Sequence, residues 1–226
     1  MLSIIIPVYN EEKTVKEIIL KVKSVSIRKE ILVIDDGSTD RTYESIKDIP
    51  GIQIIRHDRN MGKGCAVRTG LDRAQGSILV IQDADLEYEP DDLISLYDYL
   101  LTSGDRVVYG SRIMGKKLGF SKSYSSFFFY WGGRFVSILT SVLWACKITD
   151  EATCYKMFRR ELLDKIRLES RGFEICVEMT SKFLKEGCTI HEIPIRYNPR
   201  KMQEGKKIRW HDGLKAIGFL LKYRFL

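Results

Sequence analysis

Short apolar runs alternate with amphipathic stretches along the first 110 residues, and this alternation limits the fold more than any other feature. The apolar runs that predict strands are 3–8, 30–34, 52–56, 78–81 and 106–109. The stretches that predict helices are 14–22, 41–47, 65–74 and 91–101. The first of them shows the i, i+3, i+4, i+7 spacing of one apolar helix face. Such alternation predicts right-handed crossovers and an α/β fold with a mainly parallel sheet covered by helices.

The last third of the chain continues this pattern less regularly. We expect a strand at 154–158, a short helix at 161–166, a helix that ends at Lys185, a strand at 189–196 and an amphipathic helix at 213–225. Pro194 indicates an edge strand, because proline cannot donate to a strand ladder. A chain of 226 residues, 44% of them hydrophobic, is expected to form one domain, residues 1–226.

Cysteine spacing bears on the cellular compartment. The five cysteines are odd in number, and no two have C-x-x-C spacing. This argues against a disulfide framework and against a zinc site. Met1 leads directly into the first apolar run, so we expect no cleaved leader. These features favour a reducing cytoplasm.

Acidic side chains cluster where the 78–81 run ends. Asp83, Asp85 and Glu87 follow it at i, i+2 spacing. The three carboxylates would converge on one spot if the chain stays extended, because such residues then point the same way. Ligands bind at the carboxyl ends of parallel strands, and carboxylate oxygens suit a hard divalent cation. A solvated acidic turn before Pro90 is the alternative.

The net charge of +7 is concentrated near the C-terminus. Residues 196–224 hold nine Lys and Arg against two acidic residues, whereas the rest of the chain balances at 28 basic and 28 acidic residues. A basic segment of this kind predicts contact with nucleic acid, anionic lipid or a phosphorylated substrate.

Residues 127–144 form an aromatic and apolar stretch that carries one charge, Arg134. The stretch is nearly long enough to span a bilayer. However, Gly132, Gly133 and Arg134 lie inside it, and a central Arg costs roughly 2.5–3.5 kcal/mol on insertion scales. We therefore expect amphipathic helices at approximately 118–147 and 208–226 that lie at a membrane interface. A buried core or subunit contact is the second interpretation, and a membrane span is the third.

Five motifs occur in an order that resembles a known enzyme family. They are Pro7-Val8-Tyr9-Asn10-Glu11, Val33-Ile34-Asp35-Asp36-Gly37-Ser38-Thr39-Asp40, Asn60-Met61-Gly62-Lys63-Gly64, Asp83-Ala84-Asp85 and Gly110-Ser111-Arg112. Together they resemble the family 2 glycosyltransferases, and more narrowly the dolichyl- and polyprenyl-phosphate mannose and glucose synthases. The motifs cover about the first 115 residues densely, and the rest matches more loosely. The resemblance implies a GT-A fold, with a Rossmann-like, mainly parallel sheet, in one catalytic domain.

The resemblance implies a donor site for a GDP- or UDP-sugar. The first-strand residues and Asp36 would contact the nucleoside, the glycine-rich turn would lie near the base or phosphates, and Asp83 would lie against ribose and sugar. The implied donor-binding residues are Pro7, Tyr9, Asn10, Glu11, Asp36, Gly62, Lys63, Arg68, Asp83 and Ala84. Helix capping is the alternative for Asp36, and the glycine-rich segment by itself would be a plain turn.

The resemblance also implies a bound Mg²⁺ or Mn²⁺. Asp85 would bind the metal together with the diphosphate, and Glu87 and Asp83 would complete the ligand set. The chain departs from the family at Glu87, where many mannose-type members have Gln. The metal would neutralise charge that builds on the leaving nucleoside diphosphate.

The family reaction is an inverting single displacement, and a lipid phosphate needs positioning more than a general base because it is already an anion. Arg112 matches the arginine of the family's G-S-R motif, and Arg134 and Arg200 match its two other phosphate-binding arginines. The alternatives are a snorkelling interface residue for Arg134 and a solvated loop for Arg200. Asp150 matches an acidic residue that is a candidate base. The implied catalytic residues are thus Asp85, Arg112 and Asp150.

Two further positions qualify the resemblance. The family often has a Ser-Gly pair after its acidic residue, and this chain has Thr153-Cys154 instead, which suggests a different acceptor or sugar. Glu178 fits a later acidic position of the family, or it caps or pairs within its own helix.

The leading functional hypothesis is transfer of a hexose from a GDP- or UDP-sugar to dolichyl or undecaprenyl phosphate at the cytoplasmic face of a membrane. The enzyme would bind there peripherally, through a membrane-anchored partner or as a homo-oligomer. The alternative within enzymes is transfer to a saccharide or protein hydroxyl. The alternative from another class is a non-catalytic module that binds nucleotides or nucleic acid, which the aromatic stretch disfavours.

Overall fold

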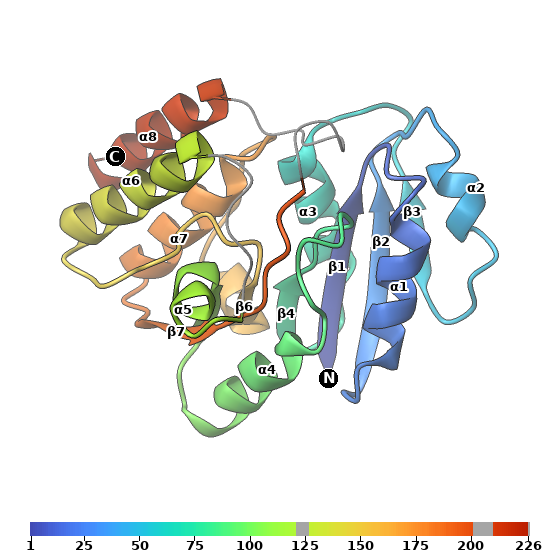
Figure 1. Cartoon of the computed structure of the whole chain (residues 1–226), viewed down its shortest axis with the longest axis horizontal. Coiled ribbons are helices and arrows are strands. Elements are labelled where there is room, and N and C mark those ends of the chain that lie inside the picture. Colours follow the sequence, from blue (N-terminus) through green and yellow to red (C-terminus); the bar gives the residue numbers. More distant parts are fainter. Residues whose placement is uncertain (121–126, 201–209, 226) are drawn as a thin grey trace.

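The computed structural model describes residues 1–120, 127–200 and 210–225. Within them, seven strands form one sheet in the order β3-β2-β1-β4-β6-β5-β7. The strands are β1 (Leu2–Val8), β2 (Lys29–Asp35), β3 (Gln53–Arg56), β4 (Ile78–Ile81), β5 (Val107–Ser111), β6 (Lys156–Arg159) and β7 (Ile190–Pro194). The pairs are parallel except where β6 meets β4 and β5. The predicted α/β fold with a mixed, mainly parallel sheet is confirmed (Figure 1).

Helices flank this sheet along the whole described chain. They are α1 (Val15–Ser24), α2 (Thr42–Ile46), α3 (Lys63–Arg73), α4 (Asp92–Thr102), α5 (Arg112–Lys117), α6 (Phe127–Trp144), the 3-10 helix η1 (Arg160–Asp164), α7 (Ile175–Lys185) and α8 (Trp210–Phe225). Each predicted strand and helix has a counterpart, and β4 has the predicted bounds. The six-residue α5 was not predicted, because it is too short to show a helical period.

The centre of the sheet is apolar on both faces. Ile5 in β1 and Val80 in β4 are fully or almost fully buried, as parallel strands require when helices cover them. α3 approaches β1 closely because Gly70 has no side chain: a Cβ there would lie 2.4 Å from Ile5 Cγ2. β7 is the last strand in the order, so the edge position indicated by Pro194 is confirmed.

α6, α7 and α8 lie side by side at one end of the molecule, away from α1 and α2 (Figure 1). They share a small apolar core in which Val136, Val177 and Leu220 are buried. Residues 121–126 and 201–209, which include part of the predicted interface helices and of the basic segment, lie outside the described residues.

One face of α6 is apolar and exposed. Trp131, Phe135, Ile138 and Val142 are at least half exposed, and their i, i+4, i+7, i+11 spacing places them on one side of the helix. α8 adds further exposed apolar side chains, which are Leu214, Leu221 and Phe225. Among the helices described, none combines the length and hydrophobicity that a bilayer span requires. The interface and the subunit contact stay predictions.

Candidate active site

A cavity of about 930 Å³ lies at the carboxyl ends of β1 and β4 and extends to α6 and α8. All but two of the site residues implied by the sequence line it, the exceptions being Asn10 and Arg68. The lining residues of that set are Pro7, Tyr9, Glu11, Asp36, Gly62, Lys63, Asp83, Ala84, Asp85, Glu87, Arg112, Arg134, Asp150 and Arg200. Val136 and Ala216 add an apolar wall. The cavity therefore joins the acidic end of β4 to arginines and to the α6–α8 pair.

The segment after β4 is a turn, so the expectation that an extended chain brings three carboxylates together is wrong. Leu86 has a φ of 60°, and this left-handed residue turns the backbone. Asp83 pairs with Lys63 at 2.6 Å, and Asp85 lies 3.4 Å from Arg200. In the described part of the chain, no three His, Cys, Asp or Glu side chains are grouped so that they could hold a metal ion.

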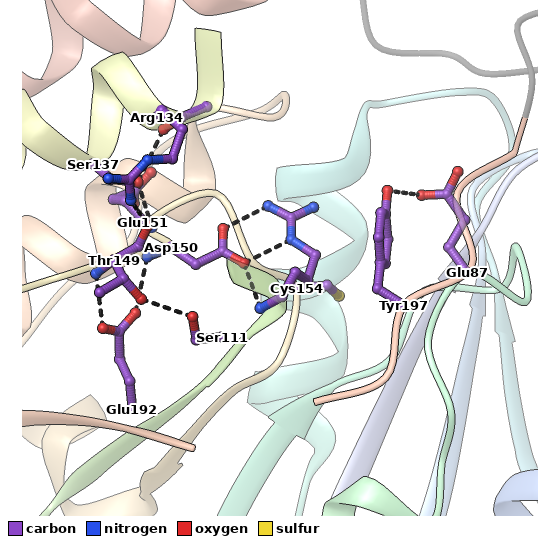
Figure 2. A network of polar contacts seen from close by, with 12 residues as sticks. Glu87, Ser111, Arg134, Ser137, Thr149, Asp150, Glu151, Cys154, Glu192 and Tyr197 are labelled. Carbon is purple, nitrogen blue, oxygen red and sulfur yellow. Dashed lines mark hydrogen bonds and ion pairs between the residues drawn. The ribbon is translucent and has the colours of Figure 1, made fainter. Parts of the chain in front are cut away.

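Glu87 faces the segment that follows β7. Its carboxylate accepts a hydrogen bond from the Tyr197 hydroxyl at 2.5 Å (Figure 2). It accepts a second one from the Arg200 backbone N–H at 2.8 Å. Both oxygens of Glu87 are thus engaged by this segment, at a position where the sequence implied a metal ligand. These two hydrogen bonds anchor residues 197–200 beside the end of β4.

Asp85 has a carboxyl group whose pKa is raised by its surroundings. Burial raises the pKa of Asp85 to about 7, the charges of Asp83 and Glu87 add to this effect, and Arg200 opposes it. An added positive charge beside Asp85 would relieve the repulsion. Mg²⁺ is commonly held by one or two carboxylates plus substrate phosphates. The residues at the end of β4 therefore fit a divalent cation that shares its coordination with a diphosphate.

Arg200 lies among acidic side chains and is only 16% exposed. Its guanidinium binds Glu11 through Nη1 at 2.9 Å and Nη2 at 3.2 Å, in addition to the longer contact with Asp85. The solvated basic loop that was the alternative for Arg200 is therefore wrong. The arginine links the end of β1 to the end of β4.

Arg112 and Asp150 form a bidentate pair at the wall of the cavity. Arg112 Nε and Nη2 each donate to the Asp150 carboxylate at 2.7 Å, and the Arg112 backbone N–H donates to it at 2.9 Å. The Tyr197 ring centre lies 5.1 Å from the guanidinium carbon, within the range of a cation–π contact. Arg134 of α6 donates to the Thr149 carbonyl at 2.9 Å, next to Asp150 (Figure 2). Arg134 is thus directed toward the cavity wall, which disagrees with the snorkelling alternative.

Hydrogen bonds connect the loops that follow β1, β2 and β3. The Asp36 carboxylate accepts the backbone N–H groups of Met61 and Gly62 at 2.9 and 2.8 Å, so it fixes the glycine-rich turn. Asn10 accepts the Thr39 N–H at 2.8 Å through its side chain and does not line the cavity. Asn10 therefore ties the two loops together, a contact that the motif did not reveal.

Gly62 and Gly64 are approached closely by the protein's own backbone. A Cβ at Gly62 would lie 2.4 Å from the Arg171 carbonyl oxygen, and a Cβ at Gly64 would lie 2.4 Å from that of Ser170. The Gly64 N–H donates to the Arg171 carbonyl at 2.7 Å. Arg68 donates to the Leu168 carbonyl at 3.4 Å, outside the cavity. The two glycines thus pack against residues 170–171, and Arg68 contacts Leu168. Residues 168–172, the cover segment, therefore lie over the start of α3, which the sequence did not indicate.

Glu178 holds this cover segment in place. Its carboxylate accepts the Glu169 and Ser170 backbone N–H groups, each at 2.8 Å, and pairs with Lys182 at 2.6 Å. Burial opposes ionisation of Glu178, but these hydrogen bonds outweigh it and lower the pKa of Glu178. The pair with Lys182 agrees with the alternative of pairing within the helix. The sequence did not indicate the contacts with Glu169 and Ser170.

Sequence motifs also missed several residues that line the cavity. These are Tyr88, Ile113, Phe173, Cys176 and Tyr197. None of them belongs to the five motifs, although Tyr88 and Ile113 directly follow the site residues Glu87 and Arg112.

Comparisons with known proteins agree with this geometry. The model of the family described as glycosyl transferase family 2 matches residues 3–167. The UDP-N-acetylglucosamine–dolichyl-phosphate N-acetylglucosaminyltransferase of Methanococcus voltae is 27% identical over 100% of this chain and 95% of the relative. The polyprenol monophosphomannose synthase of Mycolicibacterium smegmatis is 29% identical over 90% of this chain and 79% of the relative.

Solved structures share the fold. The glucosyl-3-phosphoglycerate synthase of Mycobacterium tuberculosis in complex with UDP has a TM-score of 0.76 at 20% identity, with 99% of this chain and 80% of that chain covered. A structure of the same enzyme with Mn²⁺, UDP and phosphoglyceric acid has a TM-score of 0.72 at 21% identity, with 100% and 79% covered. The family model covers well over half of the chain, so the chain belongs to glycosyl transferase family 2 and is a sugar-transferring enzyme with the GT-A fold.

Proposed function

We propose that this enzyme transfers a hexose from a nucleoside diphosphate sugar to a polyprenyl phosphate at a membrane surface. The observation that carries the proposal is the cavity in which the acidic end of β4 faces arginines and an apolar wall from α6 and α8. Carboxylates suit a metal–diphosphate, arginines suit a phosphate, and the apolar wall suits a prenyl chain. The relatives named for dolichyl phosphate and polyprenol support the same acceptor class.

The donor would lie over the carboxyl ends of β1, β2 and β4. Asp36 fixes the glycine-rich turn before the donor arrives, so its backbone loses little freedom on binding. Tyr9 and Glu11 line the same side of the cavity. The Lys63–Asp83 pair at 2.6 Å offers one cation for a phosphate and one carboxylate for sugar hydroxyls. A GDP-sugar and a UDP-sugar are both compatible with this arrangement.

Asp85 would hold Mg²⁺ or Mn²⁺, with Asp83 beside it. When bound, the metal would supply Lewis-acid stabilisation of the leaving diphosphate. Glu87 would support the site from outside the coordination shell, because its oxygens are engaged by Tyr197 and Arg200. The Mn²⁺ in the solved structure of similar fold supports a divalent metal here.

Arg112, Arg134 and Arg200 would bind the acceptor phosphate. Arg112 uses Nε and Nη2 for Asp150, which holds its guanidinium plane fixed and leaves Nη1 for a phosphate oxygen. Arg200 would exchange part of its carboxylate contacts for the phosphate. Orientation of an anionic phosphate toward the anomeric carbon is then the main task, since no proton has to be removed. With a hydroxyl acceptor, Asp150 would instead be the candidate base.

The exposed apolar face of α6 and α8 would contact the membrane. Lys215, Lys222 and Arg224 of α8 add positive charge near it, which favours anionic lipid headgroups. This arrangement would make the enzyme peripheral at the cytoplasmic face. A membrane-anchored partner or a second copy of the chain could cover the same face instead.

A donor and acceptor panel tests the proposal. The purified protein would be incubated with Mn²⁺, labelled GDP- and UDP-hexoses, and dolichyl or undecaprenyl phosphate in vesicles. We expect a labelled lipid with one donor, and loss of that product in Asp85→Asn. His191→Gln is the matched control, because His191 stacks on Tyr99 away from the cavity. Absence of a lipid-linked product with every donor would refute the proposal, and product on a lipid-free saccharide would favour the hydroxyl-acceptor alternative.

A further inference from the structure

Three consecutive backbone N–H groups near the site are each accepted by a side chain from another element. Glu192 Oε2 accepts the Thr149 N–H at 2.7 Å, and Glu192 Oε1 accepts the Asp150 N–H at 2.9 Å. Ser137 Oγ accepts the Glu151 N–H at 3.0 Å. Figure 2 shows Glu192 and Ser137 on opposite sides of this segment. Residues 149–151 belong to no helix or strand, so these side chains define their position.

Glu192 makes the most demanding of these contacts. It lies on β7, and each of its two oxygens accepts one of two adjacent N–H groups. This bidentate arrangement requires two acceptors at a fixed reach, which a carboxylate provides. The Ser111 and Thr149 hydroxyls, 2.7 Å apart, add a contact from β5 on the same side. Thr149 and Asp150 are thus held against the β5–β7 edge of the sheet.

The two hydrogen bonds from Thr149 and Asp150 to Glu192, called the clamp below, connect to the wall of the cavity. Asp150, held through its backbone by Glu192, binds Arg112 with three hydrogen bonds of 2.7 to 2.9 Å. Arg112 and Asp150 line the cavity, whereas Glu192 does not. Any shift of the Asp150 backbone therefore moves the Arg112 guanidinium, because the bidentate pair couples the two side chains.

We propose that Glu192 is a positioning residue for acceptor binding, which acts through Asp150 on Arg112 without touching substrate. The inference rests on the proposed acceptor role of Arg112 and Asp150. It assigns a function in the reaction to an edge-strand carboxylate that carries no family motif. In the described part of the chain, the Glu192 carboxylate bonds to Thr149 and Asp150 and not to the donor-side residues, so the inference separates the two halves of the site.

Glu192→Gln is the sharpest perturbation. The amide keeps the size of the side chain and one acceptor oxygen, but its NH₂ group faces the second backbone N–H, donor against donor. The Asp150 backbone should therefore shift away from the side chain at position 192. A misplacement of about 1 Å can cost roughly 100-fold in rate. We expect the kcat/KM for the acceptor to fall about 10- to 100-fold, while the affinity for the nucleoside diphosphate with Mn²⁺ stays within about twofold.

A double-variant comparison distinguishes positioning from a general structural effect. If Glu192 acts through Asp150, then Glu192→Gln combined with Asp150→Asn should be no worse than Asp150→Asn alone. Glu192→Asp keeps two acceptor oxygens but shortens their reach by one methylene group, so it should also lower the kcat/KM for the acceptor. His191→Gln, on the other face of the same strand, should change neither acceptor kinetics nor donor affinity. Multiplicative losses in the double variant, or an equal loss of donor affinity in Glu192→Gln, would overturn the inference.

Amide hydrogen exchange supplies a readout that needs no acceptor. Glu192→Gln should lower the protection of the Thr149 and Asp150 amides and leave the amides of β1 and β4 unchanged. Unchanged protection at these two amides would overturn the clamp whatever acceptor the enzyme uses. If the wild-type protein makes no lipid-linked product but the exchange result holds, the proposed function fails while the clamp stands.

Discussion

Replacing Lys156 with methionine should strongly destabilise the protein. Lys156 and Glu151 are each only 1% exposed at their side chains and pair at 3.4 Å. The Lys156 ammonium also donates to the Glu151 carbonyl at 2.6 Å and to the Thr180 hydroxyl at 2.9 Å. Glu151 Oε2 already has no hydrogen-bond partner in the described residues. Without the ammonium, a buried carboxylate loses its counter-charge.

The magnitude follows from this burial. Removing one partner of a buried ion pair typically costs about 3–5 kcal/mol, because the other charge is left uncompensated. Lys156→Met combined with Glu151→Gln removes both charges, so the double variant should be more stable than Lys156→Met alone. The control is Lys47→Met: its partner Glu44 lies at 2.5 Å, but the two side chains are 44% and 60% exposed. An exposed pair of this kind contributes about 0–1 kcal/mol.

Urea unfolding followed by circular dichroism measures these differences in stability, provided that the m value, the slope of unfolding free energy against urea concentration, is the same in all variants. We expect a large loss of unfolding free energy for Lys156→Met, a smaller loss for the double variant and little change for Lys47→Met. Equal losses for the two lysine variants would refute the reasoning from burial. A double variant no more stable than Lys156→Met would refute the assignment of the cost to an uncompensated charge.

Three further predictions follow from the site. The pKa of Glu178 is lowered in the folded protein, so its stabilisation is present above its unfolded pKa of about 4.3 and is lost as the pH falls through the folded pKa. The difference in unfolding free energy between wild type and Glu178→Gln, measured by urea unfolding from pH 7 to pH 3, should therefore shrink toward low pH. A difference that stays constant with pH would contradict this. Arg200→Gln removes a cation from an acidic cluster, so calorimetry without nucleotide should show tighter Mn²⁺ binding, and weaker binding would contradict the competition. Gly62→Ala should lower the free energy of unfolding by at least about 2 kcal/mol more than Gly104→Ala does. Both glycines have a positive φ, but only at Gly62 would a Cβ collide with a backbone oxygen. Equal losses in thermal or urea unfolding would contradict the close packing.

The sequence predicted the sheet well because each central strand is a continuous apolar run. β4 has the predicted bounds, since its four apolar residues are followed at once by polar ones. The conformation after β4 could not be predicted in the same way. A left-handed Leu86 has no residue-type signature, and it decides that the carboxylates face different partners.

In the site, too, the sequence predicted residues close to strand ends but not contacts between residues far apart in the chain. Motifs within a few residues of a strand end, such as Asp83-Ala84-Asp85, do line the cavity. Contacts between residues far apart in the chain were invisible, as with Glu192, which binds the backbone of residues 42 and 43 positions away. Asn10 was placed in the donor site by its motif, but in the structure it braces Thr39.

The seating of residues 170–171 on Gly62 and Gly64 has a consequence for biosynthesis. A nascent chain emerges from its N-terminus and tends to fold in that order. The glycine-rich turn would therefore leave the ribosome well before the segment that covers it. A product released before residue 168 would contain all five family motifs and yet lack the cover over the start of α3. The packing of residues 170–171 on the glycine-rich turn can thus form only after all five motifs have been synthesised.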